Sequence, residues 1–226
     1  MRDDFFKFPS TPHLAALEGV DIRDDKVMSE PERIEFLQHE LIVEEKVDGA
    51  NLGISFDPDG NVLAQNRGEY FQLPGLGQWK KLHEWLSPKL DLLFDQLTDR
   101  YILFGEWCYA RHSVAYDRLP DWFLGFDIFD KAAVRFLSCE RRDKLFRKMQ
   151  ICHVPKLSHG FFSFTELFAL LSQSRLGNGP SEGLYFRFDQ GDWLAQRAKL
   201  VRPAFMQSID EHWSRSGIQA NRLEMA

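Results

Sequence analysis

The chain has 226 residues, and its composition is that of a folded globular protein rather than of a disordered one, with 44% apolar and 27% charged residues. Its formal net charge is −6, so any anionic partner would have to meet a local basic patch. No apolar run reaches membrane-spanning length, and the start of the chain is too charged for a secretory signal. These features exclude a transmembrane protein and predict no membrane partner.

The cysteines and histidines argue against a disulfide framework and against a structural zinc site. Cys108, Cys139 and Cys152 are odd in number and widely spaced, with no C-x-x-C pair. No two histidines have the spacing that places two metal ligands on one helical face. A reducing, cytoplasmic location is therefore expected.

The amino-terminal half is predicted to contain an arm, two helical stretches and three strands. Pro9 and Pro12 resist helix formation, which makes residues 1–28 an extended arm. A capping box at Ser29, with Pro31 in the first turn, opens a helix over 29–39. Strands are expected over 41–43, 52–56 and 61–66, and a helix kinked near Pro88 over 78–97.

The carboxyl-terminal half continues with alternating strands and helices. Its expected strands are 101–104, 122–129, 184–188 and 193–200, and its expected helices are 138–150 and 163–173. A short helical tail is expected over 203–226. Strands joined mostly by turns, with helices inserted between groups, predict an α+β fold with antiparallel sheets and a single domain over 1–226.

The first chemical candidate is Lys46, in the segment E-K-V-D-G-A-N at residues 45–51. It lies between a buried strand and a tight turn at Asp48-Gly49, which would hold its amine rigidly at a sheet edge. Partial burial and nearby cations would lower its pKa and make it a usable nucleophile. The alternative is a hairpin whose turn carries a solvated lysine.

Three further candidates lie at the ends of strands or within them. Arg67 precedes a glycine, where its guanidinium could approach a phosphate or a ribose. Glu106 directly follows a buried strand and could accept ribose hydroxyls or hold a metal-bound water. Phe126 lies inside an apolar strand and could stack on a base, although an ordinary core position is the commoner role.

The last candidates belong to the two carboxyl-terminal strands. Glu182 begins an apolar strand after a glycine-rich loop. Arg197 and Lys199 are two residues apart, which places both cations on one face of a strand, as gripping a phosphate requires. A surface strand with two solvated cations is the alternative.

Each of these signals is weak alone, but their order along the chain is specific. Lys46, Arg67, Glu106, Phe126, Glu182 and Lys199 follow one another with the gaps of the nucleotidyltransferase motifs of covalent ligases. The motifs read K-V-D-G-A-N, F-G-E, F-D-I, S-E-G-L and R-A-K. Over residues 5–205 the chain resembles an ATP-dependent RNA ligase of the family typified by the phage T4 second RNA ligase.

The resemblance implies an antiparallel-sheet adenylation domain of the ATP-grasp-like ligase type, and a role for each matched residue. Lys46 would attack the α-phosphate of ATP and become lysyl-AMP. Glu45 would contact adenine mainly through its backbone, and Phe126 would stack on the same base. Glu106 would hold ribose hydroxyls, and Glu182 would position Mg²⁺ or Mn²⁺, partly through water.

The remaining implied roles concern phosphate groups. Arg67 would contact the ribose and the 5′-phosphate of the substrate, and Asn51 would lie near the AMP phosphate and assist sealing. Arg197 and Lys199 would neutralise phosphate charge. The family usually has lysine where Arg197 stands, and arginine keeps the charge of lysine but not its compact reach.

The lengths of chain before Lys46 and after Lys199 indicate which class of ligase to expect. Only 27 residues follow Lys199, too few for an oligonucleotide-binding (OB) barrel, and 45 precede Lys46, too few for the extra domain of NAD-dependent ligases. Both lengths favour ATP and RNA over NAD and DNA. A minimal ATP-dependent DNA ligase and a non-catalytic nucleotide- or RNA-binding relative are the alternatives.

A local basic patch offers a place for RNA. Residues 131–156 contain eight lysines and arginines against two acidic residues. Within the predicted helix, Arg141, Lys144 and Lys148 fall on one face, which could bind the RNA backbone or could simply be solvated. The sequence therefore predicts RNA ends carrying 3′-OH and 5′-phosphate as substrates in a repair role, with a separate end-healing kinase or phosphatase as a possible partner.

Overall fold

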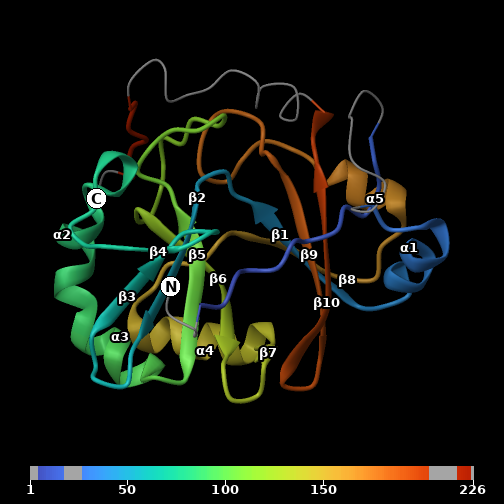
Figure 1. Ribbon diagram of the computed structural model, residues 1–226. Helices are drawn as coiled ribbons and strands as arrows, with labels where there is room; N and C mark the ends of the chain where they lie inside the picture. Colours follow the sequence, from blue (N-terminus) through green and yellow to red (C-terminus); the bar gives the residue numbers. More distant parts are fainter. Residues whose placement is uncertain (1–4, 18–26, 204–217, 225–226) are drawn as a thin grey trace.

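The computed structural model describes residues 5–17, 27–203 and 218–224, in which ten strands form two antiparallel sheets (Figure 1). The six-stranded sheet has the order β4-β3-β2-β5-β6-β7 and the four-stranded sheet the order β10-β9-β1-β8. Helices lie on the outer sides of the pair. This confirms the predicted α+β fold with antiparallel sheets, and the described residues form no closed barrel. The division into one domain over 1–226 stays a prediction.

The six-stranded sheet is built from the middle of the chain. Its strands are β2 (Ala50–Phe56), β3 (Val62–Gln65), β4 (Tyr70–Phe71), β5 (Tyr101–Trp107), β6 (Phe123–Asp130) and β7 (Arg135–Phe136). The helices against it are α2 (Leu82–Leu86), α3 (Leu90–Leu97) and α4 (Cys139–Met149), with short 3-10 turns η2 (Gly77–Trp79) and η3 (Ser87–Lys89). The helix expected over 78–97 is thus divided into four short pieces. Pro88 lies in η3, where its missing N–H interrupts the helical bonding between α2 and α3.

The four-stranded sheet joins segments far apart in the chain. Its strands are β1 (Leu41–Lys46), β8 (Lys156–Gly160), β9 (Gly183–Gln190) and β10 (Trp193–Val201), and the helices against it are α1 (Glu30–Leu37) and α5 (Phe164–Ala169). Both predicted capping boxes are present, at Ser29 and Ser163. Strand β8 was not predicted, because its sequence K-L-S-H-G is polar and lies at the sheet edge.

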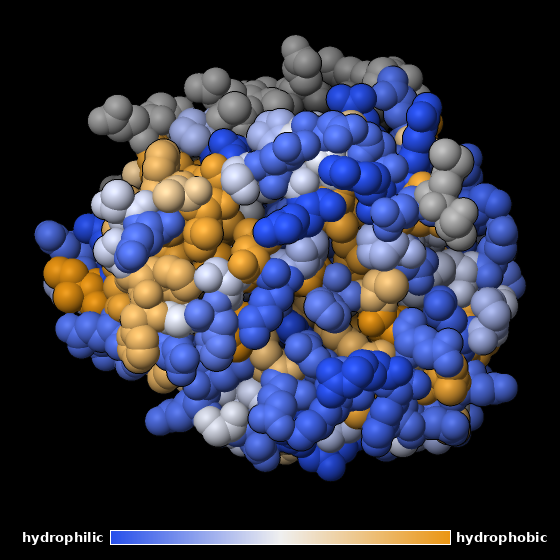
Figure 2. Space-filling view, turned by 180° about the vertical axis from the view of Figure 1, so that it is seen from behind, coloured by the Kyte–Doolittle hydropathy of each residue, from blue (hydrophilic) through white to orange (hydrophobic). Residues whose placement is uncertain are grey.

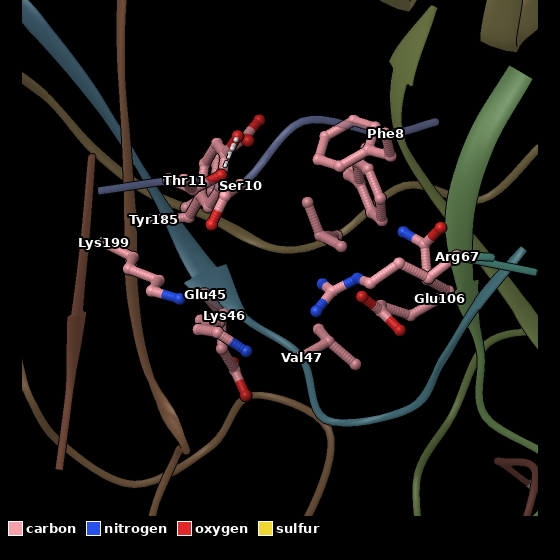
Figure 3. A pocket seen from close by; sticks show the side chains of 14 residues that line it. Phe8, Ser10, Thr11, Glu45, Lys46, Val47, Arg67, Glu106, Tyr185 and Lys199 are labelled. Carbon is pink, nitrogen blue, oxygen red and sulfur yellow. Dashed lines mark hydrogen bonds between the residues drawn. The ribbon is translucent and has the colours of Figure 1, made fainter. Parts of the chain in front are cut away.

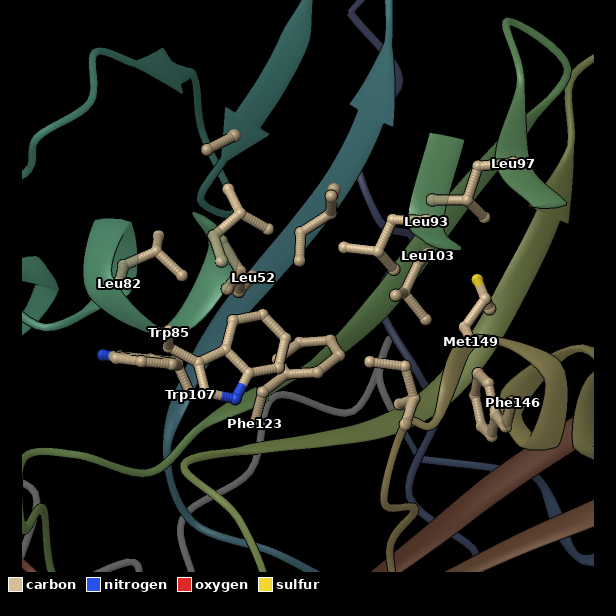
Figure 4. Close-up of a cluster of buried hydrophobic side chains, with 14 of the residues drawn as sticks. Leu52, Leu82, Trp85, Leu93, Leu97, Leu103, Trp107, Phe123, Phe146 and Met149 are labelled. Carbon is tan, nitrogen blue, oxygen red and sulfur yellow. The ribbon is translucent and has the colours of Figure 1, made fainter. Parts of the chain in front are cut away.

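Apolar cores on the outer sides of the two sheets hold the helices in place. In Figure 4, Leu52, Leu103 and Phe123 of the larger sheet pack against helix residues Leu93 and Phe146. A second cluster joins strand residues Leu41, Val43 and Leu184 to Phe36 and Leu167 of α1 and α5. The helices therefore cover the outer faces, and the inner faces of the two sheets are left to form the site.

Both ends of the described chain are extended. Along the amino-terminal arm, Leu14 donates its N–H to the Lys199 carbonyl at 2.8 Å, and Lys199 donates to Pro12 at 2.9 Å. Residues 5–17 are extended, as predicted. Most of the predicted tail helix lies outside the described residues, and residues 218–224 form isolated bridges rather than a helix.

The surface seen from behind is largely hydrophilic (Figure 2). Apolar side chains gather on the side that carries α1 and α5, where Ile34, Phe161 and Phe168 are exposed. Within the part of the chain that is described, no helix has both the length and the apolar character needed to cross a bilayer.

Candidate active site

Lys46 is the last residue of β1, at the point where the chain passes from one sheet to the other. Its strand β1 pairs with β8 and β9, whereas β2, which begins at Ala50, pairs with β3 and β5. Residues 47–49 therefore connect two sheets and do not form a hairpin. This rules out the alternative in which Lys46 lies on a simple hairpin turn.

The turn after Lys46 is fixed by hydrogen bonds to a neighbouring loop. The Asp48 carboxylate accepts from the backbone N–H groups of Ser113 and Val114 at 2.7 and 2.9 Å, and the Asp48 N–H donates to the Tyr116 hydroxyl at 2.8 Å. Residue 49 has little room for a side chain, since a Cβ atom would lie 3.0 Å from the Trp107 carbonyl oxygen. The position of Lys46 is therefore fixed by strand β1 before it and by the Asp48 turn after it.

The amine of Lys46 faces carboxylates. Its Nζ donates to both oxygens of Glu182 at 2.6 Å, and the two side chains are 24% and 14% exposed. Burial lowers the pKa of Lys46, but the charges of Glu182 and Glu106 together raise it by more. The resulting pKa of Lys46 is above the ordinary value for lysine. The expectation that neighbouring cations lower this pKa is therefore wrong for the ligand-free site.

A cavity opens beside Lys46, between the sheets and under the amino-terminal arm, and its empty space of about 650 Å³ includes open solvent (Figure 3). Figure 3 shows the amines of Lys46 and Lys199 on one side of it and Arg67 and Glu106 on the other. Asn51 and Phe126 also line the cavity, so the two sheets together supply its walls.

A second, more polar cavity adjoins the first, and its empty space of about 960 Å³ includes open solvent. The two cavities share the residues Lys46, Val47, Asn51, Arg67 and Glu106, which form the boundary between them. The rest of the second cavity comes from residues 48–50, Asn66, Gln78, Trp79 and His112. A reactive amine placed at this boundary can face a ligand in either space.

Glu106 is the most perturbed acid of the site. Burial raises the pKa of its carboxyl to about 8, against the opposing effect of Lys46 and with a further rise from Glu182. Its Oε2 and the Oδ1 of Asn51 are buried with no hydrogen-bond partner among the described residues. The two residues are paired across β2 and β5. Buried oxygens left in this way are ready acceptors for the hydroxyl groups of a ligand.

Phe126 reaches the cavity because of an irregularity in its strand. The register of β5 and β6 shifts between Phe104 and Gly105, which leaves Phe126 as the extra residue of a bulge. Its ring meets that of Phe8 edge to face, with centroids 5.3 Å apart. The cavity therefore has an aromatic wall, as base stacking would require.

The Glu45 side chain has a structural role in this state. Its carboxylate accepts from the Ser174 hydroxyl and from the Arg175 N–H, the latter at 2.8 Å, and so holds the loop after α5. Its backbone N–H donates to the Pro155 carbonyl at 2.8 Å. Glu45 also lines the first cavity, next to the proposed nucleophile.

Arg197 does not line the cavity, in contrast to Lys199. Its guanidinium donates to Asp127 at 3.1 Å and lies over the rings of Phe136 and Phe8, 4.1 and 5.0 Å from their centroids. In this structure Arg197 supports the aromatic wall from behind. Its charge is paired with the buried Asp127 carboxylate, and its expected role in neutralising phosphate stays a prediction.

Helix α4 carries the predicted basic face, but its three cations differ. The Arg141 guanidinium lies over the Trp193 ring, 4.8 Å from its centroid, and is only 27% exposed. Lys144 pairs with Glu140 at 2.6 Å on the exposed surface, and Lys148 is exposed. Only the two lysines remain well exposed, so RNA contact by this face stays a prediction that rests on Lys144 and Lys148.

Sequence reasoning missed the contributions of the arm and of β9. Phe8, Ser10 and Thr11 line the first cavity, as does Tyr185, whose hydroxyl lies 3.5 Å from Thr11 Oγ1. Tyr185 could have been found, since it lies two residues before Arg187 on the same face of its strand and opposite Lys199. The arm residues carry no such signal, because only packing brings them to the cavity.

Comparison with known proteins gives both a family and a fold. A family model described as RNA ligase matches residues 39–201. No curated protein matches this chain.

Solved structures of the Naegleria gruberi RNA ligase share the fold. A point variant with ATP and Mn has a TM-score of 0.66 at 18% identity, covering 93% of this chain and 60% of that chain. The same ligase with pyrophosphate has a TM-score of 0.61 at 17% identity, covering 92% of this chain and 65% of that one. The present chain thus spans about three fifths of the length of those proteins, and its fold is that of an RNA ligase nucleotidyltransferase.

Proposed function

Because this chain belongs to the RNA ligase family, we propose that it joins RNA 3′-OH and 5′-phosphate ends with ATP, through lysyl-AMP and RNA-adenylate intermediates. We place it near the subgroup typified by the phage T4 second RNA ligase and in RNA repair. The observation that carries the proposal is the position of the Lys46 amine at the boundary of two cavities lined by carboxylates and cations. The first cavity would hold the nucleotide. The second would hold the pyrophosphate that leaves and, later, the RNA 5′-phosphate that arrives.

In the first step the unprotonated Lys46 amine attacks the α-phosphorus of ATP. A nitrogen–phosphorus bond forms, the bond to the bridging oxygen of the β-phosphate breaks, and pyrophosphate leaves with the bond electrons. The Lys46 ammonium must give up one proton before the attack and a second as the nitrogen–phosphorus bond forms. The Glu182 carboxylate, 2.6 Å away, is placed to receive the first, and the second would pass to solvent in the open cavity. In-line positioning and charge neutralisation do most of the work in such a transfer.

The nucleotide would occupy the first cavity. Phe126 would stack on adenine with Phe8 at its edge, and the unpartnered oxygen of Glu106 would accept a ribose hydroxyl. The Glu45 backbone would lie beside the base. Lys199 would neutralise phosphate charge near Lys46, and Arg197 would do so if it left its partner Asp127.

The residues present would hold the divalent metal that this chemistry needs only together with ligands from the nucleotide. No group of three or more acidic, histidine or cysteine side chains that could hold a metal ion occurs in residues 5–17, 27–203 and 218–224. Glu182 and Glu106 flank Lys46, and Mg²⁺ commonly binds one or two carboxylates together with substrate phosphates. Mg²⁺ or Mn²⁺ held there would stabilise negative charge on the departing pyrophosphate.

The later steps would use the second cavity. Arg67 lines both spaces and would contact the ribose in one and the 5′-phosphate of the RNA in the other. AMP then passes from Lys46 to that phosphate, and the 3′-OH displaces AMP to seal the strand. Asn51, whose side chain lies at the boundary, would hold the AMP phosphate during sealing.

The decisive test is adduct formation with α-labelled ATP and a divalent metal. Wild-type protein should retain label through denaturation, and Lys46→Ala should retain none, because no other amine occupies this position. Lys144→Ala is the matched control, since Lys144 is exposed on α4 and should leave labelling unchanged. A wild-type protein that never takes up label would overturn the proposal and favour a non-catalytic relative.

Strand preference needs a separate assay. A nicked duplex with an RNA or an all-DNA 3′-OH strand should be sealed faster with RNA, and faster sealing of DNA would favour the minimal DNA ligase. A separate end-healing kinase or phosphatase, and a cytoplasmic location, stay predictions from the sequence.

The basic face of α4 is tested by charge reversal. Lys148→Glu should weaken RNA binding several-fold at low salt and reduce the slope of log affinity against log salt by about 1, because one phosphate contact is lost. Arg33→Glu on α1 is the charge-matched control. Binding by Lys148→Glu that equals that of the control would show that this face is merely solvated.

A further inference from the structure

A short segment near the carboxyl terminus, residues 218–224, packs across the loop formed by residues 108–119. Five hydrogen bonds join the backbones: Arg111 N–H to Gln219 O at 2.8 Å, Asn221 N–H to Tyr109 O at 3.0 Å, Arg222 N–H to Tyr116 O at 2.9 Å, Leu119 N–H to Arg222 O at 3.1 Å and Glu224 N–H to Leu119 O at 2.8 Å. We call this segment the strap. It lies beyond residues 39–201, where the family model matches.

Asn221 is the residue of the strap that enters the interior. It is 5% exposed, and its Oδ1 accepts from the Tyr116 N–H at 2.9 Å. Its Nδ2 donates to the Cys108 carbonyl at 2.8 Å and to the Ala110 carbonyl at 3.3 Å. One buried side chain therefore ties together both ends of the loop, and no other polar side chain described in the strap is buried.

The other side of the same loop holds the turn that follows Lys46. Ser113 and Val114 donate their N–H groups to the Asp48 carboxylate, and the Tyr116 hydroxyl accepts from the Asp48 N–H. Tyr116 thus joins Asn221, through its backbone, to Asp48, through its side chain. Hydrogen bonds of 2.7 to 2.9 Å therefore join Asn221 of the strap to the loop, and the loop to Asp48, which lies two positions after Lys46.

The loop also supplies part of the second cavity. His112 lines it and its Nε2 lies 3.0 Å from the Gln78 side-chain oxygen, which belongs to the facing wall. A shift of the loop would move this wall and the Asp48 turn together. Both lie next to the amine of Lys46.

We propose that Asn221 is a positioning residue for Lys46, which acts by holding the 108–119 loop against the Asp48 turn. The proposal rests on the proposed adenylylation of Lys46. Displacing a reacting group by about 1 Å can slow a reaction by a factor on the order of 100. Loss of the Asn221 amide would therefore act mainly on the rate of adduct formation, and much less on the apparent affinity for ATP, whose aromatic and ribose contacts come from other elements.

The experiment measures single-turnover AMP-adduct formation as a function of ATP concentration, with thermal unfolding recorded alongside. Asn221→Ala and Tyr116→Phe should each lower the maximal rate at least tenfold at temperatures where the protein is folded, with less than a threefold change in half-saturating ATP. The double variant should be no slower than the slower single variant, because both changes interrupt the same path. Asn178→Ala, which removes an exposed bond to Asp117 of this loop, is the control and should keep the wild-type rate.

The outcomes separate the two levels of inference. Absence of adduct in the wild-type protein would overturn the proposed function. A normal wild-type rate together with normal rates in folded Asn221→Ala would overturn the positioning role alone, as would additive losses in the double variant. If Asn221→Ala does not fold, Tyr116→Phe decides, since it keeps every bond of Asn221 and removes only the hydroxyl that accepts from Asp48; a normal adduct rate in folded Tyr116→Phe would overturn the positioning role.

Discussion

Two groups of buried charges lie between the sheets, and they differ in how completely the protein pairs them. In the first group, Arg142 of α4 binds Glu44 of β1 at 2.6 Å, and Asp127 of β6 binds both Arg187 and Arg197. These contacts join the smaller sheet to the larger one and to α4. We call this group the inter-sheet network.

In the second group, around Lys46, one amine faces two carboxyl groups, those of Glu182 and Glu106. Buried atoms without a hydrogen-bond partner among the described residues occur in both groups: Glu44 Oε2 and Arg187 Nε in the inter-sheet network, and Glu106 Oε2 and Asn51 Oδ1 beside Lys46. The groups differ in their ion pairs, because each carboxylate of the network named above has an arginine as its partner, whereas Glu106 forms no ion pair with the described residues. The comparison teaches that charges which hold the sheets together are matched by opposite charges, whereas two carboxyl groups at the cavity share one lysine.

The largest effect on stability is expected from breaking the inter-sheet network. Arg142→Met leaves the Glu44 carboxylate buried without its cation and should lower the free energy of unfolding by about 3–5 kcal/mol. Urea denaturation measures this loss. Lys144→Ala, two residues further along the same helix, should cost less than about 1 kcal/mol, because its ion pair is exposed. Equal losses of unfolding free energy in Arg142→Met and Lys144→Ala would contradict the view that the buried pair matters more than the exposed one.

A pH-dependent effect on stability is expected from Glu106. Its pKa of about 8 in the folded protein exceeds the ordinary value of 4.5, so the folded state keeps a proton that the unfolded state has lost. Stability from this group is present below pH 4.5 and is lost as the pH rises towards 8, by up to about 1.4 kcal/mol per pH unit.

Glu106→Gln removes this dependence, because the amide does not titrate. Relative to wild type, the variant should gain stability as the pH is raised from 5 to 8, measured by urea denaturation at several pH values. The exposed Glu69→Gln should follow the wild-type curve. Parallel curves for wild type and Glu106→Gln would show that the buried carboxyl ionises normally.

The smallest effect concerns the pH profile of adduct formation. Glu182 raises the pKa of Lys46, so Glu182→Gln should lower that pKa and move the midpoint of the rate profile to lower pH. The maximal rate should also fall, since Glu182 is proposed to position the metal. Labelling with α-labelled ATP across the pH range measures both quantities, with Glu69→Gln as the control. An unmoved midpoint would mean that the rate does not depend on the proton of Lys46.

The sequence by itself determined the elements whose signals are local. Strands β1, β5, β6, β9 and β10 follow from apolar runs, and the two capping boxes at Ser29 and Ser163 fix the starts of α1 and α5. The order of the motifs indicated the family. Besides Glu45, it named six residues that line the first cavity: Lys46, Asn51, Arg67, Glu106, Phe126 and Lys199.

Only the tertiary structure decided which charges belong to the site. Arg197 and Lys199 share a face of β10, yet one is paired with Asp127 and the other lines the cavity. Sequence spacing places side chains on a face, but it does not specify what lies opposite that face. The partners of Lys46 and Arg197, the bulge that turns Phe126 and the strap over the 108–119 loop all depend on contacts between segments far apart in the chain, and those contacts form only when the two sheets pack together.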